Sequence, residues 1–511
     1  MPLLKSRLTS LACLVSFSLT LTADVSLPHL FGDHMVLQRD HTNPVWGHAS
    51  PGEKITVAIN GQSHSTVATA EGKWRLQLSP LPVGGPYQLT VKGHNTLTFD
   101  DVLVGEVWIC SGQSNMAFAL QNTNHADVEI ASAHFPQIRL ISVPPVGTTT
   151  AQDDFNGQWE AASPQTVANF SAVGYLFGRR LHQALGVPIG LIDNAWGGSS
   201  AEAWVPREVL EADGHYTALL DSWDQRVAAY TDEVHAAAIE KFKAWQNAGR
   251  PAPVQRAPRD LRIGQHRPAN IFNGVLHPTI GYGIRGAIWY QGEANAGRAE
   301  QYRELFPLMI KTWRKLWQQG DFPFYWVQLA DFRDEVSEPG DSTWAELREA
   351  QTMTLSLPHT GQAVITDAGE QRDIHPRDKQ TVANRLVRLA LVNDYGFDMA
   401  AESPRFASMT TKGNTVTLTF DHVSSGGLYA FDIKTPLGFA IAGEDKTFVW
   451  AEAKIVGKNQ VQVSSPEVSN PAAVRYAWAD NPIANLQDRN GLLVTPFRTD
   501  DWPGITSGVV K

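Results

Sequence analysis

The chain has 511 residues, of which 43% are hydrophobic and 18% are charged, and its formal net charge is −10. This length indicates two or three domains, and the composition is that of an ordinary globular protein. The negative charge argues against a surface built for nucleic acid or for an anionic membrane, because both require clustered Lys and Arg.

The first residues have the pattern of a secretory signal peptide. Lys5 and Arg7 provide a positive start, residues 8–21 form an apolar stretch, and Ala23 ends a plausible cleavage site. We expect residues 1–23 to be removed on export, which places the mature protein in the periplasm or outside the cell. The alternative is a short hydrophobic N-terminal helix. No later run of about 20 apolar residues occurs, so we expect no membrane span.

Residues 24–104 form short segments in which apolar and polar side chains alternate. Residues 54–61 and 65–81 are two such segments, and Asn60-Gly61 is one of the turn signals between them. Regular strands with glycine-rich turns predict a small N-terminal β-sandwich-like domain.

Residues 105–401 have a different pattern, in which apolar runs alternate with helical stretches. Residues 286–290 form one of the runs, and residues 301–319 form one of the amphipathic stretches. This alternation predicts a doubly wound parallel α/β domain, whose site lies past the carboxyl ends of its strands. The more polar residues 206–270 predict a partly helical insertion. Strand patterns return in residues 402–511 and predict a C-terminal β region.

Ser114 follows the apolar run at residues 107–110, in the segment Gly-Gln-Ser-Asn-Met. It could be a helix N-cap, since Ser is favoured there, although Ala117 stands where a capping box would place Glu or Gln. It could also be a nucleophile. The segment differs from the Gly-x-Ser-x-Gly elbow of the α/β-hydrolases, because Met116 replaces the second glycine.

Two further segments carry polar groups past the ends of predicted strands. Gly197 and Gly198 would let backbone N–H groups approach a ligand closely, or they could form a plain loop. Gln291, Glu293 and Asn295 follow the run at residues 286–290 and offer donors for a carbonyl oxygen. The alternative for this segment is ordinary polar turn chemistry.

The fourth segment contains Asp373 and His375. In an extended chain, residues two apart share a face, so Asp373 could accept a hydrogen bond from the His375 ring. That is the orienting role of the acid in a catalytic triad. Pro376 is predicted to be the first residue of the helix that follows. The alternative is a capping or structural role for His375.

Together the four segments resemble the SGNH hydrolases, in which Ser, Gly, Asn and His come from four separate blocks. The chain is still more similar to the sialate O-acetylesterase family, and the similarity covers nearly the whole mature chain. The motifs that carry it include LFGDHMVLQRD (30–40), GQSNM (112–116), AWGGSSAEAW (195–204), NGVLHPTIGYGIRG (273–286), GAIWYQGEANA (286–296) and DIHPRDKQ (373–380).

The resemblance implies an esterase that removes O-acetyl groups from sugars without a metal or a cofactor. By position, it makes Ser114 the nucleophile, His375 the general base and Asp373 the orienting acid. Many SGNH enzymes place this acid three residues before the His, where this chain has Arg372. Glu293 and Asp367 are therefore alternative candidates for the acid.

The resemblance also implies an oxyanion hole and further polar contacts. The oxyanion hole would consist of the backbone N–H of Ser114, a backbone N–H at Gly197 or Gly198, and the side chain of Asn295. Gln291 and Glu293 would be polar contacts to the substrate.

The expected substrate is an O-acetylated sialic acid, and the alternative is acetylxylan or another acetylated polysaccharide. A non-catalytic carbohydrate-binding protein is the alternative of another class. The sequence contains no signal for the oligomeric state.

Overall fold

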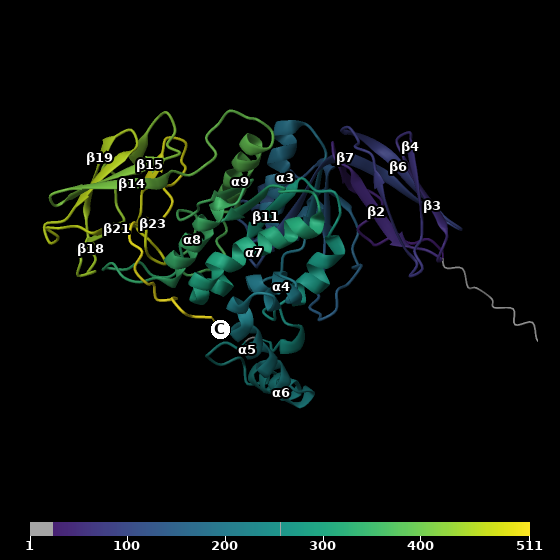
Figure 1. Cartoon of the computed structure of the whole chain (residues 1–511), viewed down its shortest axis with the longest axis horizontal. Coiled ribbons are helices and arrows are strands. Elements are labelled where there is room, and N and C mark those ends of the chain that lie inside the picture. The colour runs from purple at the N-terminus through teal and green to yellow at the C-terminus, as the bar shows by residue number, and fades with distance from the viewer. Residues whose placement is uncertain (1–23, 256, 511) are drawn as a thin grey trace, which may run out of the picture.

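The computed structural model describes residues 24–255 and 257–510, so the predicted signal peptide (1–23) lies outside the described residues. Figure 1 shows three parts along the long axis of the molecule: an N-terminal β region, a central α/β domain and a C-terminal β region. In the described ranges, no helix is both long enough and apolar enough to cross a membrane.

The central sheet is mostly parallel. Its strands lie in the order β13 (Thr360–Ala363), β12 (Phe324–Val327), β11 (Gly286–Tyr290), β7 (Thr96–Gly112), β10 (Ile189–Asp193), β8 (Phe135–Ser142) and β9 (Glu160–Ala162). Neighbouring strands are parallel except β8 and β9. The chain builds the sheet on one side of β7 and then on the other, so the crevice for a ligand is expected at the carboxyl end of β7. The predicted doubly wound α/β fold is confirmed.

Helices pack on both faces of this sheet. They are α3 (Ala172–Leu185) and α9 (Lys379–Asn393) on one face, and α7 (Ala299–Trp317) and α8 (Thr343–Met353) on the other. In β11, Trp289 packs against Phe306 and Trp313 of α7, whereas Ile288 and Tyr290 belong to the core under α3 and α9. Because both faces are covered, the inner strands β11 and β12 are apolar at every position instead of alternating.

β7 links the N-terminal β region to the central sheet. Its first half pairs antiparallel with β6 (Gly84–Lys92), and its second half lies between β10 and β11. The strand therefore runs through residue 105, where the sequence pattern changes. The remaining strands of the N-terminal region are β1 (Val36–Gln38), β2 (Asn43–His48), β3 (Lys54–Ile59), β4 (Gln62–Val67) and β5 (Lys73–Leu78).

The C-terminal β region has its own apolar core, which includes Val416, Leu418, Val461 and Val463. One sheet has the order β14 (Arg405–Lys412), β15 (Thr415–Asp421), β20 (Gln460–Ser464) and β19 (Glu452–Gly457). Another has the order β18 (Val449–Trp450), β17 (Phe439–Ala442), β21 (Ala473–Tyr476) and β23 (Phe497–Arg498), and β16 (Leu428–Ala430) pairs with β22 (Leu486–Asp488).

Arg348 of α8 attaches this C-terminal region to the α/β domain. Its buried guanidinium donates hydrogen bonds to the carbonyl oxygens of Leu329 (2.8 Å) and Ala330 (2.7 Å), and to those of Ala479 (2.6 Å) and Asp480 (2.9 Å). The loop that follows β12 is thereby held at the carboxyl edge of the sheet.

The predicted insertion contains the helices α4 (Arg207–Glu211), α5 (Thr217–Ala228) and α6 (Asp232–Asn247). Figure 1 shows α5 and α6 projecting from the α/β domain, and α6 buries none of its side chains. The other α-helices in the described part of the chain are α1 (Ala126–Ala131) and α2 (Pro164–Val167).

Candidate active site

Ser114 lies just past the carboxyl end of β7, in a tight turn that begins at Gly112. Gly112 has a φ of +135°, and a Cβ atom there would lie 2.2 Å from the carbonyl oxygen of Tyr290. Only glycine therefore allows β7 to turn beside β11. The next helical turn, η1 (Leu120–Asn122), has Ala119 as its N-cap. Ser114 caps no helix in the described chain, so the helix-cap interpretation is wrong.

His375 lies in the segment between β13 and α9 and faces Ser114. Its Nε2 is 2.8 Å from Ser114 Oγ. The imidazole is nearly parallel to the ring of Phe118, with a centroid separation of 6.3 Å and an interplanar angle of 15°. When the ring proton is on Nδ1, the Ser114 hydroxyl donates to Nε2. This is the arrangement in which an imidazole can accept the proton of an attacking serine.

The helix after His375 begins later than the sequence predicted. α9 begins at Lys379, and its N-cap is Asp378, whose carboxylate accepts a hydrogen bond from Thr381 N at 3.0 Å. The prediction that Pro376 is the first helical residue is therefore wrong. The capping carboxylate of Asp378 sets the helix start, because it satisfies an N–H that the helix itself leaves free.

Asp373 is the carboxylate that lies beside the His375 ring. Its Oδ1 is 3.3 Å from His375 Nδ1 and accepts the backbone N–H of His375 at 2.9 Å. Asp367 instead forms an ion pair with Arg385 at 2.6 Å, and Glu293 accepts a hydrogen bond from Asn115. Among the described residues, Asp373 is therefore the carboxylate within ion-pair distance of the ring, although its side chain is 58% exposed.

Gly197 lies directly against Ser114. The N–H of Trp196 donates to the carbonyl oxygen of Gly112 at 3.0 Å, which holds this loop to the end of β7. A Cβ atom on Gly197 would lie 3.4 Å from Ser114 Cβ, whereas one on Gly198 would instead approach a side chain from the insertion. The backbone at Gly197 is thus placed beside the candidate nucleophile, where an oxyanion donor is needed.

Asn295 is buried in a network of protein groups. Its Oδ1 accepts hydrogen bonds from Ala201 N (2.9 Å) and Gln291 Nε2 (2.7 Å), and its Nδ2 donates to Glu202 Oε2 (2.9 Å). Burial alone would raise the pKa of Glu202, but Arg298 and Asn295 lower it below the ordinary value. Within the described residues, no hydrogen bond joins Asn295 or Gln291 to Ser114. Their contacts to the oxyanion or the substrate remain predictions.

A second network lies beneath the Ser114–His375 pair. Asn115, next to the candidate nucleophile, donates through Nδ2 to Glu293 Oε1 (2.7 Å) and to the carbonyl oxygen of Ile374 (2.9 Å), next to the candidate base. The buried Lys379 donates to Asn115 Oδ1 at 2.6 Å. Burial raises the pKa of Glu293 and lowers that of Lys379 to about 7. Asn115 thus holds the two candidate catalytic segments together.

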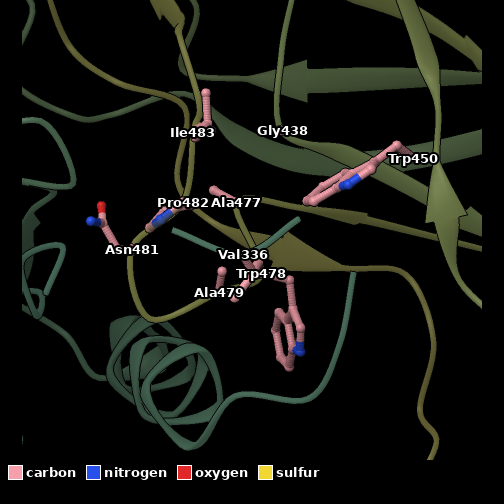
Figure 2. Close-up of a pocket in the computed structure, with 9 residues that line it drawn as sticks. All are labelled: Val336, Gly438, Trp450, Ala477, Trp478, Ala479, Asn481, Pro482 and Ile483. Carbon is pink, nitrogen blue, oxygen red and sulfur yellow. The ribbon is translucent and has the colours of Figure 1, made fainter. Parts of the chain in front are cut away.

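The hollow in Figure 2 is a different feature, at the C-terminal β region. It is lined by residues that include Val336, Trp450, Trp478 and Ile483, and none of the predicted site residues borders it. Its volume is about 20 Å³, which is enough for a single water molecule. It is too small for a sugar.

The geometry of these candidate residues is typical of one class of protein. A serine hydroxyl within hydrogen-bond distance of an imidazole, with a carboxylate on the other ring nitrogen and a glycine backbone beside it, is the arrangement of a serine hydrolase. It lies at the carboxyl edge of a doubly wound sheet, where such sites are expected.

Comparison with known proteins identifies the family. The model of a family described as "Carbohydrate esterase, sialic acid-specific acetylesterase" matches residues 104–255 and 274–386. The sialate O-acetylesterase of Mus musculus is 30% identical over 497 residues, 88% of each chain, and that of Homo sapiens is 28% identical over 533 residues, 93% of each chain. A crystal structure of a carbohydrate acetylesterase from Xanthomonas citri is 37% identical, with a TM-score of 0.80, and covers 94% of this chain and 100% of that one.

The chain belongs to the sialic acid-specific acetylesterase family of carbohydrate esterases, and it is a carbohydrate O-acetylesterase. The family predicted from the motifs is therefore confirmed. Sequence reasoning assigned no role to Asn115, Lys379, Glu202 or Arg298, which hold the candidate catalytic segments in place. Asn115 lies inside the GQSNM motif and Lys379 inside the DIHPRDKQ motif. Their location in these motifs was the sequence signal that could have pointed to a role at the site.

Proposed function

We propose that this enzyme removes O-acetyl groups from sialic acids, with Ser114 as the nucleophile, His375 as the general base and Asp373 as the orienting acid. The observation that carries the proposal is the 2.8 Å separation between Ser114 Oγ and His375 Nε2. Family membership supports the acetyl-ester chemistry, and the names of the mammalian relatives support the sialate.

In the proposed mechanism, Ser114 Oγ attacks the acetyl carbonyl carbon while its proton passes to His375 Nε2. Backbone N–H groups at Ser114 and Gly197 or Gly198 stabilise the oxyanion. The C–O bond to the sugar then breaks, and the sugar oxygen takes the proton from His375. A water molecule next attacks the acetyl-enzyme and gives a proton to His375, and Ser114 recovers a proton as acetate leaves.

The substrate is tested by measuring acetate release. We expect a higher kcat/KM with 9-O-acetylated N-acetylneuraminic acid than with acetylated xylan, because the family is described by its sialic acid specificity. The same protein with Ser114→Ala serves as the blank for spontaneous deacetylation. If neither substrate yields acetate above this blank, the proposed function is wrong.

A polysaccharide O-acetylesterase is the second candidate. The relative from Xanthomonas citri is described as a carbohydrate acetylesterase, with no mention of sialate, and its identity to this chain is higher than that of the mammalian relatives. A higher kcat/KM on acetylated xylan would favour this candidate. A purely carbohydrate-binding role has no support, since the family consists of esterases.

We further propose that the enzyme is exported and acts in the periplasm or outside the cell. The support is the charged start and apolar stretch of residues 1–23. The intact mass of the protein from its native compartment should correspond to a chain that starts near Asp24. A mass that includes residue 1 would contradict the proposal.

Replacing Asp373 by Asn should lower kcat/KM for p-nitrophenyl acetate by roughly 10- to 100-fold, less than the ~10⁴-fold loss seen where a triad acid is buried. The reason is that Asp373 is 58% exposed and 3.3 Å from Nδ1, so solvent screens its charge. The control is Asp367→Asn, whose carboxylate is paired with Arg385. If kcat/KM falls in the Asp367 variant and not in the Asp373 variant, Asp367 and not Asp373 is the orienting acid.

A further inference from the structure

A cleft separates the N-terminal β region from the α/β domain. Its volume is about 360 Å³, within the range of small-molecule sites, and it is bordered by β2, β5 and residues 277–280. The side chains that line it include Trp46, Trp74, Lys73, Arg75, Asp153 and His277. Two indoles and several charged groups therefore line the same cleft. A gap that merely separates two domains needs no such combination of side chains.

Arg75 carries a charge with no counter-ion in the described part of the chain. Its guanidinium carbon lies 5.4 Å from the centroid of the Trp46 ring, and the two residues are direct cross-strand partners. No hydrogen bond or ion pair to the guanidinium occurs among the described residues, and burial lowers the pKa of Arg75. A Cβ atom on Gly281 would lie 2.9 Å from Arg75 Nη2, so the glycine leaves room for the guanidinium.

The other charges of the cleft leave this positive charge uncompensated. Lys73 Nζ is 3.1 Å from Asp153 Oδ2, so that carboxylate already has a partner. The Nδ1–H group of His277 donates to the carbonyl oxygen of Gln152 (2.8 Å), and Nδ1 lies 3.9 Å from Asp153 Oδ1. The cleft is thus locally positive on a chain whose formal net charge is −10.

We propose that this cleft binds a sugar unit that carries a carboxylate, with the carboxylate on Arg75 and the sugar ring against Trp46. A guanidinium matches a carboxylate with two parallel hydrogen bonds, and the C–H groups of a sugar ring pack against an aromatic face. Sialic acids and uronic acids share this chemistry.

The proposed site is separate from the catalytic one and goes beyond the proposed function. The cleft lies beside the N-terminal strands, whereas Ser114 follows the far end of β7. None of the predicted catalytic residues lines the cleft. A sugar unit bound in the cleft would hold a glycan on the enzyme, and it would not be the unit that enters the catalytic centre.

The test is ligand-observed NMR on the full mature protein with N-acetylneuraminic acid, glucuronic acid and the methyl ester of each. We expect Arg75→Met to weaken binding of the preferred acid by about 10-fold or more, and the methyl ester to bind the unmodified protein more weakly by a similar factor. The acid that binds more tightly identifies the source of the ligand. Arg226→Met is the matched control, because Arg226 lies 4.1 Å over the Trp223 ring on an exposed surface elsewhere.

Hydrolysis of p-nitrophenyl acetate by the Arg75 variant should be unchanged, so the outcome is independent of the proposed catalytic mechanism. The proposal is overturned if neither acid binds the unmodified protein, or if the Arg75 variant binds the acids as tightly as the unmodified protein does. Equal binding of acid and ester would overturn it as well, and this comparison needs no variant at all.

Discussion

Replacing Ser114 by Ala should lower kcat for acetate release by roughly 10³- to 10⁶-fold, since serine hydrolases lose about this much when the nucleophile is removed. The variant keeps the Gly197 backbone and His375, but it has no oxygen to form the acetyl-enzyme. The loss of one hydrogen bond, from Ser114 Oγ to His375, should change the stability by only about 1 kcal/mol. The measurement is the initial rate of acetate release together with thermal unfolding.

Ser111 provides a matched control near the end of β7, the strand that leads to Ser114. Its hydroxyl is fully buried and has no hydrogen-bond partner in the described residues. Ser111→Ala therefore removes the same atom three residues earlier and should leave both activity and stability nearly unchanged. If Ser114→Ala keeps more than about 1% of the activity, or if both variants lose it equally, Ser114 is not the nucleophile.

The sheet could be predicted because its strands are covered on both faces, which leaves a plain signal in the sequence. The GAIWY run of β11 is buried at every position, so it is apolar at every position. β7 was harder to predict as one strand. Its first six residues alternate between exposed and half-buried positions, and the rest are buried. The sequence pattern therefore changes where β7 passes from a partly exposed sheet into the buried one, although the strand itself continues.

The candidate catalytic residues could be predicted because each follows a strand or lies in a short local pattern. Asp373 and His375 are two residues apart, and their contact follows from local geometry. The contact between Asn115 and Lys379 beneath them has no local signal, because the two residues are 264 residues apart in the chain. Only the fold brings the ends of β7 and β13 and the start of α9 together.

Replacing Lys379 by Met should lower kcat by roughly 10- to 100-fold, because displacing catalytic groups by about 1 Å can cost about 10²-fold. Lys379 fixes the amide of Asn115, whose Nδ2 holds the carbonyl oxygen of Ile374 next to His375. Without the ammonium group, Asn115 Oδ1 loses its donor, and the spacing between Ser114 and His375 is no longer enforced. KM should change less than kcat, since Lys379 is fully buried beneath the Ser114–His375 pair.

The same variant should change how stability depends on pH. Burial lowers the pKa of Lys379 to about 7 in the folded protein, whereas an unfolded Lys titrates near about 10.4. Between these values the unfolded state binds more protons, so the free energy of unfolding of the unmodified protein gains up to about 1.4 kcal/mol per pH unit from this group. Below pH 7 both states are protonated and the group contributes no slope.

Urea unfolding at pH 7, 8 and 9 measures this difference, because the contributions of the other groups are shared by both proteins. Lys379→Met should lack the rise that Lys379 contributes above pH 7, and Lys311→Met, at an exposed position of α7, should retain it. Parallel pH profiles for the unmodified protein and Lys379→Met would show that the buried ammonium group is not destabilised as proposed. A normal kcat in that variant would show that Lys379 does not position His375, even if the stability profile changed as expected.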